Sequence, residues 1–242
     1  MIIRVFKRDN IPVEDSPRSG HTPDGATWIA VFDGPASTRR YFYAWIPRGS
    51  LTKSPLVLVG LNPSTAASHG TPTDPTVTTI ASIIADNTLR VIDETTRLQP
   101  ELVQPRTIDC VVIVNLYTLV KGSGFLDWLK NQPQQLLRRD AAAADLVIAC
   151  TNSFCGQVAP VAGHTAAKKY LLAWGSDTLL VPRARQVLDA ISPALFLQAI
   201  PENVRTDTSQ NLDKFRATSL SPLSLRTRGR WKGFVSVPDP LI

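Results

Sequence analysis

The sequence predicts a doubly wound α/β protein, in which helices pack on a mainly parallel sheet. From Pro55 onward, short apolar runs of strand length alternate with segments of helical spacing or composition, which is the pattern of repeated strand–helix units. The chain has 242 residues and 43% hydrophobic content, enough to bury a full core in one unit with decorations. We therefore expect functional residues outside the carboxyl ends of the strands.

The first fifty-odd residues depart from this alternation. Residues 10–25 hold three prolines and two glycines, which predict a loop. The segments Thr27–Phe32 and Arg40–Ile46 are rich in aromatic and β-branched residues, and the turn signal Asp33-Gly34-Pro35 separates them. They are expected to form an antiparallel pair.

Four short apolar runs predict the strands of the main sheet: Leu56–Leu61, Cys110–Val114, Tyr170–Trp174 and Ala194–Ile200. Helices are predicted between them at Asp74–Asn87, Phe125–Leu129, Arg138–Cys150 and Arg183–Ile191. Leu146–Cys150 is also compatible with a fifth strand, although Asp140 followed by four alanines favours a helix. The expected organisation is a β extension at 1–54 packed on an α/β unit at 55–242.

Charge and composition narrow the class of partner. The net charge of +6 and the pI near 9.5 favour an anionic partner, although many basic proteins bind no nucleic acid. The three cysteines fit a reducing compartment and cannot complete a four-cysteine metal site without other ligands. No apolar run approaches the roughly 20 residues of a membrane span, and the N-terminus lacks the apolar core of a signal peptide. We expect a soluble, cytoplasmic protein with no membrane partner.

Three segments carry polar residues in positions suited to chemistry. They are LVLVGLNPS (Leu56–Ser64), CVVIVNLYTLV (Cys110–Val120) and SLSPLSLRTRGRWKG (Ser219–Gly233). Each also has a structural interpretation. Asn62 can cap an Asn-Pro turn, and Asn115 can be a buried amide that ties down the following loop. The alternating basic residues at the end of the third segment can form a solvated edge.

In this order the three segments, together with Trp174-Gly175-Ser176, resemble the strand-end motifs of the uracil-DNA glycosylase superfamily. Its members break the bond between a flipped-out base and its deoxyribose. The resemblance covers residues 55–233 by motif order, with low identity between motifs. Arg40–Ile46, Gly60–Ala66 and Asp74-Pro75-Thr76 together also resemble a little-studied bacterial and phage branch, and some relatives of this kind excise hypermodified cytosines in phage defence. The implied fold is a three-layer α/β/α sandwich with a central four-stranded parallel sheet, plus the N-terminal antiparallel β pair.

The resemblance implies roles for the first two motifs. Asn62 would orient the attacking water; its neutral amide cannot serve as a strong base, so most of the rate would come from charge stabilisation elsewhere. Asn115 would read the edge of the pyrimidine, since one amide offers both a donor and an acceptor. Ser64 stands where uracil-specific enzymes carry a tyrosine that blocks the 5-position, so a 5-substituted pyrimidine could enter. Gly60 and Leu61 would complete the base pocket, and Trp174 is expected to be core.

The third motif resembles a His-Pro-Ser-Pro-Leu-Ser loop, but Ser219 replaces the histidine that steadies the departing base anion. A serine hydroxyl supplies less stabilisation than such a histidine, so another group or a better leaving group is required. Leu223 would wedge into the vacated base stack. DNA contacts are implied for the rest of the loop and the basic strip after it: Ser221, Pro222, Ser224, Arg226, Arg228, Arg230 and Lys232.

Two further residues lie on the loop that leaves Asn62. Asp74 followed by Pro75 is typical of a helix start, with Asp74 as the N-cap. Asp74 or His69 could instead polarise the water that Asn62 holds.

The sequence thus predicts a monofunctional DNA N-glycosylase that flips a 5-modified pyrimidine, glucosylated hydroxymethylcytosine among the candidates, and leaves an abasic site. We expect it to act as a monomer on double- or single-stranded DNA, without metal or cofactor. One alternative is a uracil-DNA glycosylase of base-excision repair, and another is a hydrolase of free nucleosides or nucleotides. A third is a protein that binds modified bases without cleaving them, which the serine at Ser219 and the amide at Asn62 keep open.

Overall fold

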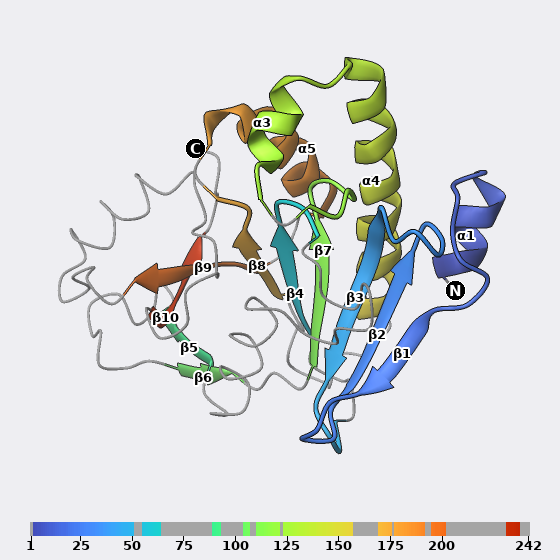
Figure 1. Cartoon of the computed structure of the whole chain (residues 1–242). Coiled ribbons are helices and arrows are strands. Elements are labelled where there is room, and N and C mark those ends of the chain that lie inside the picture. The colour runs from blue at the N-terminus through green and yellow to red at the C-terminus, as the bar shows by residue number, and fades with distance from the viewer. Residues whose placement is uncertain are drawn as a thin grey trace.

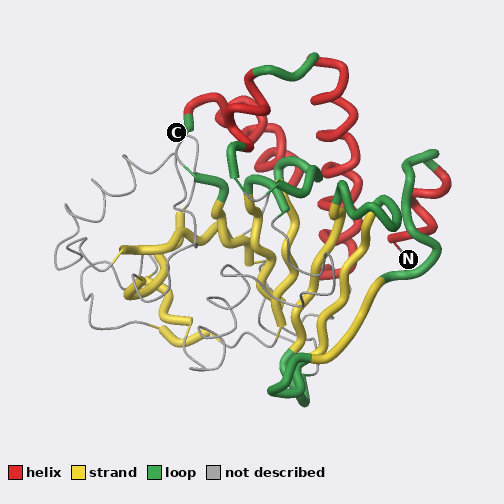
Figure 2. The backbone as a smooth tube through the Cα atoms, in the orientation of Figure 1, coloured by secondary structure: helices red, strands yellow, loops and turns green. Residues whose placement is uncertain are grey.

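The computed structural model describes residues 2–50, 55–63, 89–92, 104–106, 110–121, 123–156, 169–175, 177–191, 195–201 and 231–237 (Figures 1 and 2). The helices are α1 (Ile2–Arg8), α3 (Phe125–Lys130), α4 (Gln134–Gly156) and α5 (Val181–Ile191), with a 3₁₀ turn at Thr178–Leu180. The strands are β1 (Arg18–His21), β2 (Thr27–Phe32), β3 (Arg40–Ile46), β4 (Pro55–Gly60), β5 (Leu89–Ile92), β6 (Gln104–Arg106), β7 (Cys110–Asn115), β8 (Lys169–Ala173), β9 (Leu195–Pro201) and β10 (Trp231–Val237). The described part of the chain is therefore mixed α/β.

The strands form one mixed sheet in the order β1-β2-β3-β7-β4-β8-β9-β10-β5-β6. β4 pairs in parallel with β7 on one side and with β8 on the other, and β8 pairs in parallel with β9. Antiparallel pairs join β1, β2, β3 and β7 at one end of the sheet, and β9 and β10 toward the other. The strands after β4 are thus added to both sides of it, which opens a crevice at its carboxyl end.

The N-terminal strands belong to this same sheet. The predicted antiparallel pair is confirmed as β2 and β3, and β3 continues into the main sheet through its antiparallel pairing with β7. The prediction of loop throughout residues 10–25 is wrong, because β1 lies within it and pairs with β2. The sequence of β1, Arg-Ser-Gly-His, has no β-branched or aromatic residue, so its strand signal is weak. Arg18 anchors this edge through an ion pair with Glu14 and a guanidinium stacked on the Phe32 ring.

The four apolar runs each form a strand within one residue of the predicted bounds, as β4, β7, β8 and β9. α3, α4 and α5 confirm three predicted helices, and the alternative of a strand at Leu146–Cys150 is wrong because α4 runs through it. Val147 and Ile148 are buried one turn after Ala143 and Ala144, which is the spacing of a helix face. The predicted helix at Asp74–Asn87 lies outside the described residues. The sequence patterns do not predict α1, β5, β6 or β10.

The interior strands are buried on both faces. The helices α1, α4 and α5 lie on one face of the sheet (Figure 1). The strand side chains that share a buried core with residues of these helices include Val57, Val59, Val112, Val114, Tyr170 and Leu172. The alternate residues on the opposite face are buried as well, among them Leu56, Leu58, Val111, Ile113 and Leu171. Burial on both faces explains why these strands are continuous apolar runs without polar alternation. No helix in the described residues has the length and apolar character needed to cross a membrane.

Candidate functional site

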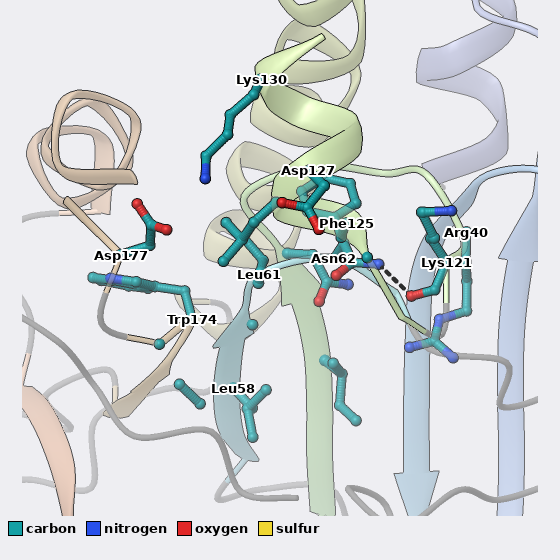
Figure 3. Close-up of a pocket in the computed structure, with 17 residues that line it drawn as sticks. Arg40, Leu58, Leu61, Asn62, Lys121, Phe125, Asp127, Lys130, Trp174 and Asp177 are labelled. Carbon is teal, nitrogen blue, oxygen red and sulfur yellow. Dashed lines mark hydrogen bonds between the residues drawn. The ribbon is translucent and has the colours of Figure 1, made fainter. Parts of the chain in front are cut away.

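A cavity of about 600 Å³ opens at the carboxyl ends of β4, β7 and β8 (Figure 3). This volume is in the range of small-ligand sites. Its lining residues are Arg40, Leu58, Gly60, Leu61, Asn62, Ile113, Asn115, Lys121, Gly124, Phe125, Leu126, Asp127, Lys130, Ala173, Trp174, Gly175 and Asp177. The cavity therefore collects the residues that follow three neighbouring strands, together with the start of α3 and one arginine from β3.

Asn62 is held by the loop that follows β7. Its Nδ2 donates to the carbonyl oxygens of Lys121 at 2.8 Å, Pro63 at 3.0 Å and Leu119 at 3.3 Å. Figure 3 draws the bond to Lys121 as a dashed line. These acceptors require a donor, so they determine which end of the amide is nitrogen. Because the NH₂ group is engaged by the loop, Oδ1 is the Asn62 atom suited to accept a hydrogen bond from a ligand or water in the cavity.

Asn115 lies directly beside Gly60. The two residues are register partners at the ends of β7 and β4, and Asn115 is 7% exposed. A Cβ added at Gly60 would lie 2.7 Å from Asn115 Oδ1, closer than van der Waals contact allows. The glycine thus makes room for the amide at the floor of the cavity. Only a residue without a side chain leaves Asn115 in this position.

The loops after β4 and β7 are joined by backbone hydrogen bonds. Leu116 N donates to Gly60 O at 2.9 Å, and Tyr117 N donates to Leu61 O at 3.1 Å. Lys121 N donates to Pro63 O at 3.2 Å. The two loops consequently form one unit, and a shift in either would move both asparagines.

A buried carboxylate supports this unit from α4. Asp140 accepts from Thr118 N at 2.7 Å and from Thr118 Oγ1 at 2.5 Å, and Arg39 Nε donates to it at 3.1 Å. Asp140 is 2% exposed, so these bonds replace the hydration that burial removes. They tie the middle of the β7 loop to the helix beneath it.

A buried arginine of α5 supports the start of the same loop. Arg183 Nε donates to Leu116 O at 3.0 Å, and its guanidinium also donates to Ala141 O at 3.1 Å and pairs with Asp145 at 2.8 Å. Burial raises the pKa of the neighbouring Tyr117 hydroxyl above its ordinary value, so this phenol stays neutral at physiological pH. The loop is therefore fixed by paired polar groups on α4 and α5.

Five charged residues that the sequence does not predict as site residues line the cavity: Arg40, Lys121, Lys130, Asp127 and Asp177. Arg40 begins the Arg40–Ile46 segment, and the other four lie outside the sequence motifs. Arg40 is buried, whereas Asp127 and Lys130 are exposed on α3. Asp177 Oδ1 accepts from Leu179 N at 3.0 Å and so caps the 3₁₀ turn. Lys121, Lys130, Asp127 and Asp177 lie in turns and a short helix that contain no recognisable motif. Only the proximity of Lys121 and Asp177 to the ends of the strand motifs offers a signal.

Four of the predicted base-binding and catalytic residues meet in this cavity: Gly60, Leu61, Asn62 and Asn115. Trp174, expected as core, is buried in the core and also forms part of the lining. Lys232 lies in β10, where the adjacent Trp231 pairs with Pro201 of β9, so the basic strip ends in a strand of the sheet. The other predicted site residues lie outside the described part of the chain: Ser64, His69, Asp74, Ser219, Ser221, Pro222, Leu223, Ser224, Arg226, Arg228 and Arg230.

The described side chains combine two amides with cationic and acidic groups around an otherwise apolar cavity. Such a set can hydrogen-bond the edge of a polar ring and stabilise negative charge. Within the described ranges, no three histidine, cysteine, aspartate or glutamate residues are grouped so that they could hold a metal ion. Comparison with protein-family models, with curated proteins and with solved structures finds no match to this chain.

Proposed function

We propose that the protein is a DNA N-glycosylase that hydrolyses the bond between a flipped-out pyrimidine and its deoxyribose. The observation that carries this proposal is the cavity that collects Gly60, Leu61, Asn62 and Asn115 at the ends of adjacent strands. Asn62 and Asn115 are 53 positions apart in the sequence, so their motifs are distant along the chain. Their meeting in one small-ligand cavity supports a shared role.

Asn62 is proposed to hold the attacking water. Its amide nitrogen is bound by loop carbonyls, which leaves Oδ1 to accept a hydrogen bond from water. The amide then orients the nucleophile and takes up no proton, so the charge that develops on the base must be stabilised by other groups. Asp74 and His69 are proposed as groups that polarise this water, and Asp177 is a further carboxylate at the cavity.

Asn115 is proposed to read the Watson–Crick edge of the base. Its buried amide presents one donor and one acceptor, the pattern that matches adjacent ring and exocyclic positions of a pyrimidine. Its Oδ1 lies so close to Gly60 that a Cβ added there would be only 2.7 Å away, so the amide has little space on that side. A fixed amide discriminates between cytosine-type and uracil-type bases better than a mobile one.

The resemblance to the uracil-DNA glycosylase superfamily also leads us to propose the finer fold, a three-layer α/β/α sandwich around a four-stranded parallel sheet. The parallel pairings among β7, β4, β8 and β9 support it. The helices described on one face of these strands, and the burial of the opposite face, are consistent with layers on both sides.

For the substrate we propose a pyrimidine with a 5-substituent, glucosylated hydroxymethylcytosine among the candidates, and a role in phage defence. The small residue Ser64 supports this choice, since it stands where uracil-specific relatives carry a blocking tyrosine. DNA is proposed as the partner of a monomeric, cytoplasmic enzyme that needs no metal or cofactor. The loop at Ser219–Ser224 and the basic strip from Arg226 to Lys232 are proposed to grip the backbone.

The direct test is the production of abasic sites. The protein is incubated with duplex and single-stranded DNA that contains uracil, hydroxymethylcytosine, glucosylated hydroxymethylcytosine or only unmodified bases, and is then treated with alkali. Strand breaks at the modified position are expected, because alkali cleaves only where a base has been removed. Binding of modified DNA without breaks would contradict the glycosylase and favour a modified-base reader. Breaks at uracil alone would favour the repair enzyme.

Substitution of Asn62 tests the role of the water. Asn62→Ala is expected to lower single-turnover excision by on the order of tenfold to a thousandfold, while DNA affinity changes by only a few-fold. The rate is measured with enzyme in excess, and affinity is measured by fluorescence anisotropy on the same duplex. Unchanged excision by this variant would remove Asn62 from the mechanism.

A further inference from the structure

Arg40 is the most deeply buried charge at the cavity. It begins β3 and is 2% exposed, yet it forms part of the cavity lining. Figure 3 shows its guanidinium extending from β3 toward the cavity, near the hydrogen bond between Asn62 and Lys121. Its Cζ lies 5.1 Å from the centroid of the Tyr43 ring, a cation–π contact that helps to hold the guanidinium in place.

Burial distinguishes Arg40 from the other cations of the site. Lys130 is exposed and Lys121 is partly exposed, so water screens both ammonium groups. A cation that is shielded from water acts on a neighbouring charge through a lower effective dielectric, and its interaction is several times stronger than that of an exposed cation.

Resting on the proposed function, we propose that Arg40 stabilises the negative charge of the departing base, in place of the histidine that Ser219 replaces. In this step the C1′–N1 bond breaks and both of its electrons leave with the base, while the water oxygen forms a bond to C1′. Water releases a proton to solvent, and the base anion takes up a proton from solvent. The products are the neutral base and the abasic sugar.

The guanidinium suits this role because it remains protonated throughout the cycle. Arg40 therefore acts as a fixed positive charge and hydrogen-bond donor, and it transfers no proton. Asn62 orients the water, and Arg40 stabilises the negative charge on the departing base. The neutral amide of Asn62 could not provide that stabilisation.

Leaving-group dependence tests Arg40 directly. Arg40→Gln is expected to lower single-turnover excision by on the order of a hundredfold to a thousandfold, and Arg40→Lys by less, because the lysine keeps the charge. The defect of Arg40→Gln is measured on uracil and 5-fluorouracil in the same duplex, or on 5-hydroxymethylcytosine and 5-formylcytosine if the enzyme acts on cytosine-type bases. The fluorine and formyl groups withdraw electrons and make the base a better leaving group, so the defect should shrink several-fold on the fluorinated or formylated base. An equal defect on both bases would overturn the proposal, since misfolding or misplacement slows both alike.

Arg18→Gln is the matched control. Like Arg40, Arg18 is an arginine stacked on an aromatic ring, with its Cζ 4.4 Å from the Phe32 centroid, but it is only partly buried, lies in β1 and is not part of the cavity lining. This variant should lose stability without a change in leaving-group dependence. Thermal unfolding of each variant shows whether its fold is retained.

If the Arg40 variants do not fold, ligand binding to the wild-type protein tests the same role. Barbiturate is an anionic ring at neutral pH with nearly the shape of neutral uracil. Calorimetry should show that barbiturate binds about tenfold or more tightly than uracil, because the buried cation favours the anion. Equal binding, or tighter binding of uracil, would overturn the role of Arg40. If the wild type makes no abasic site on any DNA, the proposed function fails, whereas this preference still decides whether the cavity selects an anionic ring.

Discussion

At the scale of single residues, the site depends on how two amides are oriented. Asn62 is oriented by backbone carbonyls that accept from its nitrogen, whereas Asn115 occupies space that only a glycine at position 60 leaves open. In both cases the constraint comes from the backbone of a neighbouring segment. A substitution at Gly60 should therefore affect Asn115 as strongly as a change in Asn115 itself.

Gly60→Ala is the prediction that belongs to this contact. The new Cβ would lie 2.7 Å from Asn115 Oδ1, so the amide must move or the strands must separate. We expect a decrease of about 1–3 kcal/mol in the free energy of unfolding. Excision should fall by on the order of a hundredfold, because displacement of a positioning group by about 1 Å has an effect of this size. Urea unfolding and single-turnover kinetics measure the two effects.

The double variant Gly60→Ala/Asn115→Ala is the control for that contact. Removing the amide removes the clash, so the double variant should be more stable than the sum of the two single variants predicts, by about 0.5–3 kcal/mol. Strict additivity of the unfolding free energies would show that the alanine at position 60 is accommodated without displacing Asn115.

At the scale of elements, the helices behind the sheet position the loop that follows β7. Asp140 on α4 and Arg183 on α5 reach the loop residues Thr118 and Leu116 from below. The loop in turn supplies the carbonyls that orient Asn62. The site is thus coupled to the packing of two helices, although neither residue lies in the cavity lining.

Asp140→Ala is expected to destabilise the protein by about 2–4 kcal/mol, because it leaves the buried Thr118 amide and hydroxyl without their acceptor. Asp140→Asn keeps one acceptor oxygen, so it should destabilise the protein less. Excision by Asp140→Asn should fall while DNA affinity holds, since the loop loosens without any decrease in positive charge. Urea denaturation and the alkali assay measure these outcomes.

Asp15→Asn provides the comparison for Asp140, because the Asp15 carboxylate is 97% exposed and pairs with Lys7 at the surface. Its unfolding midpoint should stay at the wild-type value, since exposed ion pairs contribute little. If Asp140→Ala destabilises the protein no more than Asp15→Asn does, the β7 loop does not depend on α4.

At the scale of the whole molecule, the positive charge is distributed over several surfaces. The net charge of +6 is moderate, and α1, which carries Arg4, Lys7 and Arg8, lies beside the edge of the sheet formed by β1 and β2 (Figure 1) and contributes no residue to the cavity lining. Because any cation contributes to a general attraction for DNA, net charge alone does not identify a binding surface. The dependence of affinity on salt does identify one, since it counts the phosphates that a surface neutralises.

The basic strip should account for that salt dependence. Alanine at Arg226, Arg228 and Arg230 is expected to weaken binding to all DNA sequences alike, because these side chains are proposed to neutralise phosphates and to read no base. The log–log salt slope should decrease by about one unit for each phosphate that is no longer neutralised. Affinity is measured by anisotropy over a series of salt concentrations.

A triple variant on α1, with alanine at Arg4, Lys7 and Arg8, removes the same formal charge away from the cavity and should keep the wild-type slope. If the two triple variants lower the slope equally, the basic strip makes no specific contact with phosphate.

Much of the framework follows from the sequence alone, because it depends on local pattern. Continuous apolar runs predict β4, β7, β8 and β9. Of these, β4, β7 and β8 are buried on both faces, and strands of this kind need no polar alternation. Asn62 and Asn115 stand out for a related reason, since a polar residue at the end of such a run must lie at or just beyond the carboxyl end of a strand. The placement of both in one cavity follows once the strands are known to be parallel neighbours.

Other features were decided only by contacts between distant segments. β1 has weak strand propensity and exists through its pairing with β2, and Arg40 reaches the cavity because β3 pairs with β7. The acceptors that orient Asn62 include the carbonyls of Leu119 and Lys121, which lie 57 and 59 residues further along the chain. Sequence patterns report which face of an element is apolar, whereas the neighbour that each polar group meets depends on strand order and register. For that reason the sequence predicts the two asparagines as site residues, whereas it does not predict the arginine that shares their cavity.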